Sequence, residues 1–164
     1  MEKVKKRFFI WLGVLLAALL IGTYLDSLMR TWSPIYLRVL AILGMVFSFL
    51  LLRVSGRTLK TLGEPEEWGW TTKLVTEGLY SCIRHPHHLG IGLFVTFLSM
   101  LVGLFTTLVT ALLIWISIYL FLVRVEEPEA LEKFGQEYQR YREKVPMLLG
   151  SPICLLREVI NGLR

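Results

Sequence analysis

The chain has 164 residues, of which 54% are hydrophobic and 19% are charged, and its formal net charge is +5. Soluble domains usually contain about 45–50% apolar and about 25% charged residues. Here the apolar excess is concentrated in long runs, so the composition predicts a single all-α integral membrane domain, residues 1–164. The positive charge does not require a nucleic-acid partner, because Lys and Arg mark the cytoplasmic face of membrane proteins. The two cysteines, Cys82 and Cys154, match no metal spacing, and we expect neither a disulfide framework nor a zinc ribbon.

Four apolar runs predict about four transmembrane helices. Residues 1–54 hold the first two, Phe8–Leu25 and Ile35–Val54. The first run is longer than the apolar region of a secretory signal peptide, roughly 7–15 residues, and no A-x-A site follows it, so we expect it to be retained as a span. The other two, Leu89–Leu104 and Leu108–Val125, are separated by very few residues. They should therefore form an antiparallel helical hairpin.

The polar segments complete the predicted organisation. Residues 55–88 form an irregular loop that carries the main polar motif, the hairpin occupies 89–125, and 126–164 form the tail. In the tail, apolar side chains recur every three or four residues up to Val145-Pro146, which predicts an amphipathic cytoplasmic helix that ends there. Ile153–Leu163 is expected to form a short helix on the membrane surface.

The distribution of basic residues predicts the orientation. Sixteen of the eighteen Lys and Arg residues fall in the N-terminal segment, the middle loop or the tail, and the exceptions are Arg30 and Arg38. By the positive-inside rule, both termini and the middle loop should be cytoplasmic. We expect the protein to reside in the cell membrane.

A first polar cluster lies in the stretch Gly78–Gly90, where the third span begins. It contains Arg84, His85, His87 and His88, and such residues at the mouth of a span are costly unless they are paired or wet. They are either interfacial anchors or part of a functional site, and the sequence alone leaves both open. A metal site that uses Cys82 with these three histidines is the less favoured alternative, because no acidic partner stands at a standard zinc spacing.

A second polar cluster, Arg124–Glu127, follows the fourth span and precedes Pro128. A proline inside a helix removes the hydrogen bond to the carbonyl four residues earlier, here that of Arg124. A freed carbonyl beside Glu126 and Glu127 would suit a cation or ribose hydroxyls. Alternatively, these carboxylates simply open the next helix and favour its dipole. We expect the two clusters to meet at one membrane surface.

Taken together, the clusters resemble the isoprenylcysteine carboxyl methyltransferase family, whose larger group includes phospholipid methyltransferases. The residues that match are Gly78, Tyr80, Arg84, His85, Pro86, Glu126, Glu127, Phe134, Gly135, Tyr138, Tyr141, Val145 and Pro146. The resemblance covers residues 72 to about 152, and the first two spans carry no signature. It implies a membrane methyltransferase that uses S-adenosyl-L-methionine. The acceptor would be lipophilic: a small molecule, a lipid such as a phospholipid amine, or a lipidated protein such as one with a prenylcysteine carboxylate.

The resemblance also implies roles for residues at the cytoplasmic surface. The cofactor would be bound by Thr72, Lys73, Leu74, Val75, Tyr80, His85, Pro86, His87, His88 and Glu126. The catalytic candidates are Arg84, Arg124 and Glu127, with an arginine holding an anionic acceptor, and no metal is expected. Two departures matter: the family usually has Tyr at the position of His88, and its substrate-side arginine at the position of Leu122.

Two other functions remain as alternatives. One is an NADPH-dependent membrane reductase related to the sterol reductases, although those proteins are much longer. The other is a non-catalytic membrane protein that keeps the fold. Methyl transfer is favoured because several separated motifs keep the family's order and spacing. In such a reaction the cofactor supplies the reactivity and the protein supplies mainly alignment.

Overall fold

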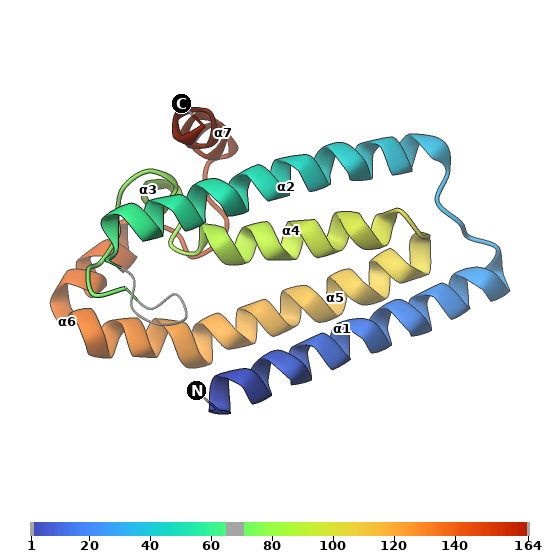
Figure 1. Ribbon diagram of the computed structural model, residues 1–164, viewed down its shortest axis with the longest axis horizontal. Coiled ribbons are helices and arrows are strands. Elements are labelled where there is room, and N and C mark those ends of the chain that lie inside the picture. The colour runs from blue at the N-terminus through green and yellow to red at the C-terminus, as the bar shows by residue number, and fades with distance from the viewer. Residues whose placement is uncertain (1, 65–70, 164) are drawn as a thin grey trace. The chain divides into compact units, whose positions relative to one another are not determined.

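The computed structural model describes residues 2–64 and 71–163, with side chains from residue 12 onward (Figure 1). Residues 65–70 of the predicted middle loop lie outside the described residues. The elements are α1 (Glu2–Met29), α2 (Ile35–Leu62), α3 (Leu79–Cys82), α4 (Pro86–Met100), α5 (Leu104–Phe121), the π-helical turn η2 (Leu122–Glu126), α6 (Glu127–Lys144) and α7 (Pro152–Gly162). The described part contains no strand, which confirms the all-α class.

Three segments of the described chain are long and apolar enough to cross a membrane: Leu12–Met29, Ile35–Leu62 and Leu104–Lys144. They correspond to the first, second and fourth predicted spans, and the protein is an all-α integral membrane protein. The third predicted span forms α4, which has only 15 residues. At 1.5 Å per residue α4 is about 22 Å long, less than the roughly 30 Å of a bilayer core.

Helix α2 continues beyond the predicted end of its span. The sequence placed that end at Val54, whereas the helix runs to Leu62. The hydroxyls of Ser55, Thr58 and Thr61 each donate to a carbonyl three or four residues earlier in the same helix, at 3.1, 2.9 and 3.0 Å. Because these polar side chains are satisfied by their own helix, a change in composition from apolar to polar does not end it.

The residues group into two compact units. The first comprises residues 1–46 and 92–119, and the second comprises 47–91 and 120–164. All residues that the sequence singled out as candidate site residues belong to the second unit. The single-domain organisation stays a prediction.

In the first unit, the carboxylate of Asp26 anchors the start of α5. Asp26 is fully buried. Its Oδ1 accepts a hydrogen bond from the amide of Phe105 at 2.9 Å, and its Oδ2 accepts from the amide and hydroxyl of Thr106 at 2.9 and 2.6 Å. Backbone amides at a helix N-terminus lack partners within the helix, so a carboxylate there is stabilising. The predicted hairpin is confirmed within this unit, where the indole of Trp115 on α5 donates to the hydroxyl of Thr96 on α4 at 3.2 Å.

In the second unit, Cys82 of α3 and Cys154 of α7 form a disulfide, with their Cα atoms 5.9 Å apart. The expectation that the cysteines would not pair is therefore wrong. The two residues are 72 positions apart, and they meet because α7 returns to pack on α3. Nothing in their sequence spacing signals this return.

The tail follows the predicted pattern with one interruption. Helix α6 is amphipathic, and Tyr138 and Tyr141 are buried on its apolar side. It ends where Val145 becomes extended, with φ −116° and ψ 125°, as the Val145-Pro146 pair predicts. Gly135 has φ 52° and ψ −126°, a backbone conformation that favours glycine, and it kinks α6. Helix α7 confirms the predicted short terminal helix.

Candidate functional site

The backbone between α3 and α4 is fixed by the chain that follows α6. The amide of Arg84 donates to the carbonyl of Pro146 at 2.9 Å, and the amide of His85 donates to that of Met147 at 3.2 Å. Upstream, Gly78 has φ 60° and turns the chain into the single turn of α3. An L side chain would be strained in this conformation, which explains why the motif needs glycine at this position. The segment around Arg84 is thus held in place by a segment about sixty residues later in the sequence.

Arg84 and Glu127 form a bidentate ion pair. The Nε atom of Arg84 donates to Oε1 of Glu127 at 2.9 Å, and its Nη2 donates to Oε2 at 3.1 Å. Each side chain is only 9% exposed. The remaining donor, Nη1, bonds to the carbonyl oxygens of Arg142 and Val145 at 2.9 and 2.7 Å. The guanidinium therefore joins the start of α6 to its end, and four hydrogen bonds engage most of its five N–H donors within the fold.

His85 bridges two neighbouring carboxylates. Its Nδ1 lies 2.9 Å from Oε2 of Glu126, and its Nε2 lies 2.7 Å from Oε1 of Glu127. A neutral imidazole has one N–H, whereas the imidazolium has two and can donate to both carboxylates. Burial alone would lower the pKa of His85, but the hydrogen bonds and negative charges of Glu126 and Glu127 outweigh it and raise that pKa. The arrangement is best satisfied by a charged His85.

The turn η2 explains how consecutive glutamates reach the same histidine. The amide of Glu127 donates to the carbonyl of Leu122, five residues earlier rather than four. Pro128 has no N–H, and in a regular helix its ring would clash with the carbonyl of Arg124. The wider turn relieves this clash and also reduces the angle between successive side chains below the 100° of an α-helix. Glu126 and Glu127 can thus both point at His85.

Two further histidines extend the cluster in different directions. Nδ1 of His88 lies 3.5 Å from Oε2 of Glu126, and its ring centre lies 5.6 Å from that of Phe121. His87 is exposed, and its Nδ1 lies 3.4 Å from the hydroxyl of the buried Ser55 on α2. His88 therefore belongs to the carboxylate cluster, whereas His87 faces away toward α2.

Three tyrosines support the cluster. The hydroxyl of Tyr138 donates to Oε1 of Glu127 at 2.7 Å, and that of Tyr141 donates to the carbonyl of Tyr80 at 2.6 Å. Burial, together with the negative charge of Glu126, raises the pKa of Tyr80. Tyr138 was not among the predicted site residues. The signal that could have identified it was its place on the apolar face of the amphipathic helix, where a phenol needs a buried partner.

Glu126 is the glutamate of the cluster that can still accept hydrogen bonds from a ligand. Its contacts with His85 and His88 both use Oε2. Among the residues that the structure describes, Oε1 has no hydrogen-bond donor, and the side chain is 33% exposed. An accessible carboxylate oxygen can accept hydrogen bonds from ribose hydroxyls or from a cationic group, and aromatic rings nearby suit a cation. The site is thus chemically compatible with S-adenosyl-L-methionine.

Within the described chain, the remaining predicted residues make no polar contact with this cluster. Thr72 and Lys73 bond to Glu64 after α2, through the Thr72 amide at 3.2 Å and a Lys73–Glu64 ion pair. Val75 is buried and Leu74 is half-buried. Pro86 is buried and begins α4. Arg124 lies exposed in η2, and no described acidic residue pairs with it.

The cluster also satisfies one spacing criterion for a metal ion. One ligand atom from each of His85, His88 and Glu126 lies within 4.8 Å of the other two. Such a nitrogen and oxygen set is of the kind that binds zinc. However, Nδ1 and Nε2 of His85 already face carboxylate oxygens at hydrogen-bond distance. The expectation of no metal stays a prediction.

The chain is similar in sequence to known methyltransferases. A family model described as phospholipid methyltransferase matches residues 32–137. Protein-S-isoprenylcysteine O-methyltransferase of Schizosaccharomyces pombe is 36% identical over 74 residues, which cover 44% of this chain and 31% of the relative. The match thus spans less than a third of the relative's own length. No solved structure matches the chain.

Proposed function

The chain belongs to the phospholipid methyltransferase family, and from that premise we propose that it transfers a methyl group from S-adenosyl-L-methionine to a lipophilic acceptor at a membrane surface. The observation that supports this most is the junction of the two polar clusters at His85. Residues about forty positions apart converge there on a carboxylate, that of Glu126, which is one-third exposed. Ionisable side chains are costly next to the membrane-spanning part of a protein, and those found there usually have a function.

The cofactor would be held mainly by Glu126, His88 and Tyr80. Oε1 of Glu126 would accept hydrogen bonds from ribose or ammonium groups, while His85 keeps Oε2 in place. The buried Tyr80 ring would provide an aromatic neighbour for a cation. When bound, S-adenosyl-L-methionine supplies an electrophilic methyl group on a sulfonium. The protein then contributes alignment and a negative electrostatic environment.

Arg84 and Glu127 would act as positioning residues. Their bidentate pair leaves little of either group for an acceptor, and Glu127 also fixes His85. Arg124 remains the candidate for holding an anionic acceptor, since it is exposed and lies two residues before Glu126. A guanidinium presents two parallel donors, which match a carboxylate or phosphate.

The acceptor class follows from the surroundings of the site. The motif sits at the end of apolar helices, so an acceptor with a lipid tail could reach it from the bilayer while a soluble cofactor arrives from water. A prenylcysteine carboxylate, a phospholipid amine and another apolar acceptor all satisfy this condition. We propose that the site faces the cytoplasm, from the distribution of basic residues.

Equilibrium binding separates this proposal from its alternatives. The purified protein in detergent micelles should bind S-adenosylhomocysteine and not NADPH. Glu126→Gln should weaken that binding roughly tenfold, the scale of one charge-assisted hydrogen bond. Glu132→Gln is the matched control, since Glu132 lies exposed on α6 and its replacement removes the same charge. Binding of NADPH alone would indicate a reductase, and binding of neither would indicate a non-catalytic protein.

A further inference from the structure

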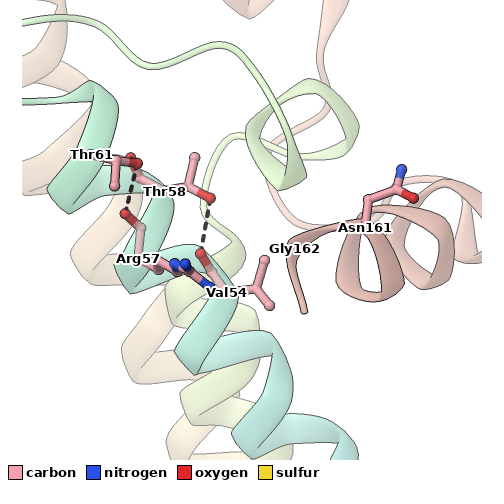
Figure 2. Close-up of a pocket in the computed structure, with 6 residues that line it drawn as sticks. All are labelled: Val54, Arg57, Thr58, Thr61, Asn161 and Gly162. Atoms are coloured by element: carbon pink, nitrogen blue, oxygen red, sulfur yellow. Dashed lines mark hydrogen bonds between the residues drawn. The ribbon is translucent and has the colours of Figure 1, made fainter. Parts of the chain in front are cut away.

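A polar cavity lies between α2 and α7, apart from the His85 cluster (Figure 2). Its volume is about 260 Å³. The lining residues are Val54, Arg57, Thr58 and Thr61 of α2 with Asn161 and Gly162 of α7. Gly162 makes the junction close, because a Cβ atom there would lie 2.4 Å from Cγ1 of Val54. None of the lining residues contacts the His85 cluster, which consists of Arg84, His85, His88, Glu126 and Glu127.

The cavity lies on a basic face of α2. Arg53, Arg57 and Lys60 recur at spacings of four and three residues, so they share one side of the helix. All three are exposed, and none pairs with an acidic residue in the part of the chain that the structure describes. They follow directly on the apolar part of a membrane-spanning helix, which is the depth at which phospholipid headgroups lie.

The hydroxyls in the cavity specify the ligand further. Thr58 and Thr61 already donate their protons to carbonyls of α2, as the dashed lines in Figure 2 show. Their oxygens are therefore left as acceptors, whereas Arg57 offers only donors. A ligand for this cavity should combine an anion for the guanidinium with hydroxyl donors for the threonines. The Asn161 amide can serve either part.

Helix α7, which lines one side of the cavity, also carries an exposed apolar stripe that suits acyl chains. On α7, the apolar side chains of Ile153, Leu156 and Ile160 are 80%, 52% and 47% exposed, and they recur every three or four residues. A different face of α7 is buried through Leu155 and Val159. A basic cavity at the end of a spanning helix, lined in part by a helix that also carries an exposed apolar stripe, is compatible with an interfacial lipid site.

We propose that this cavity binds the headgroup of an anionic glycerophospholipid that carries hydroxyl groups, such as phosphatidylglycerol. The phosphodiester would accept from Arg57, the headgroup hydroxyls would donate to Thr58 and Thr61, and the tails would lie along α7. The site is independent of methyl transfer, so it stands or falls separately from the proposed activity.

The test measures lipid binding by the full chain in neutral detergent, with dioctanoyl phosphatidylglycerol as the probe. Native mass spectrometry would count bound lipid, and thermal unfolding would give the apparent affinity. We expect saturable binding of one lipid. Arg57→Gln should weaken it roughly tenfold, the scale of a charge-assisted hydrogen bond. Arg53→Gln is the matched control, because it removes the same charge one turn away but does not line the cavity.

Each of five outcomes would overturn the proposal. Equal losses in Arg57→Gln and Arg53→Gln would show that the lipid responds to surface charge alone. An unchanged affinity in Arg57→Gln would remove the assignment directly. Equal binding of dioctanoyl phosphatidylcholine would exclude the anionic hydroxyl-bearing class, and equal stabilisation by inorganic phosphate would exclude a lipid. Should Arg57→Gln fail to fold, Asn161→Leu decides instead: it obstructs the cavity without changing charge, so retained binding in that variant would also overturn the proposal.

Discussion

Replacing Arg84 with glutamine tests whether this arginine stabilises the fold or acts on the acceptor. The substitution removes a guanidinium that donates to both oxygens of Glu127 and to two backbone carbonyls. Both members of the pair are only 9% exposed. Removing one partner of such a buried pair costs about 3–5 kcal/mol, because the other charge is left without compensation. We expect Arg84→Gln to lower the free energy of unfolding by that amount.

The control is an arginine whose ion pair is at the surface. Arg157 pairs with Glu158 at 3.2 Å, and the Arg157 side chain is 69% exposed. Exposed pairs contribute about 0–1 kcal/mol, so Arg157→Gln should unfold close to the parent. Denaturant unfolding of all three proteins in the same micelles gives the comparison, and binding of S-adenosylhomocysteine monitors the site.

A double-mutant cycle makes the same test sharper. If the pair is structural, Glu127→Gln and Arg84→Gln should not add, and the coupling should lie within about 0.5–3 kcal/mol. An Arg84→Gln protein that unfolds like the Arg157→Gln control but has lost turnover would refute the structural assignment. The acceptor-binding role would then pass from Arg124 to Arg84.

Three further predictions concern other parts of the second unit. Because folding raises the pKa of His85, its charged contacts should stabilise the fold fully below the unfolded pKa of about 6.5, and this stabilisation should be lost as the pH rises through the folded pKa. The free energy of unfolding measured against pH should show this fall. His85→Gln should abolish the fall, whereas His87→Gln should not. Reduction of the Cys82–Cys154 disulfide, or the substitution Cys154→Ser, should lower the free energy of unfolding by about 2–4 kcal/mol, because it frees a loop of 72 residues. An unchanged free energy of unfolding in the presence of a phosphine reductant would show that the bond contributes nothing. Arg124→Ala should reduce turnover with little change in affinity for S-adenosylhomocysteine. Arg124→Lys should restore little turnover if the guanidinium binds the acceptor through two parallel hydrogen bonds. Full turnover in Arg124→Ala would exclude Arg124 as the residue that binds the acceptor.

The meeting of the two polar clusters could be predicted from the sequence. Charged groups at the ends of two apolar helices must find partners, and a tight hairpin brings the far ends of its legs to the same level. The structure confirms the meeting through Arg84, His85, Glu126 and Glu127. The partner of each residue was not predictable, because it depends on the helical phase that η2 alters. Pro128 gave a partial signal, since its clash with the carbonyl of Arg124 requires a local change of helix geometry.

Other features were hidden for identifiable physical reasons. The end of α2 was placed two turns too early, because hydroxyl side chains that bond to their own helix look like loop residues in composition. The Cys82–Cys154 bond depends on the path of α7, which is a tertiary property with no local pattern. The kink at Gly135 lies inside a regular amphipathic repeat, and a single glycine there does not distinguish a kink from a tolerated residue.

The division between stability and ligand binding within the cluster follows from the two glutamates. Glu127 is engaged by Arg84, His85 and Tyr138, so both of its oxygens serve the fold. Within residues 12–64 and 71–163, Glu126 is engaged through Oε2 alone, and its other oxygen can serve a ligand. His85 links the two, since its imidazolium compensates both charges at once. Binding of a cationic ligand to Glu126 would therefore compete with His85 for negative charge, and it would be felt at Glu127 and Arg84. For this reason a substitution at Glu127 should change cofactor affinity even without direct contact, whereas one at Glu126 should change affinity with a smaller effect on stability.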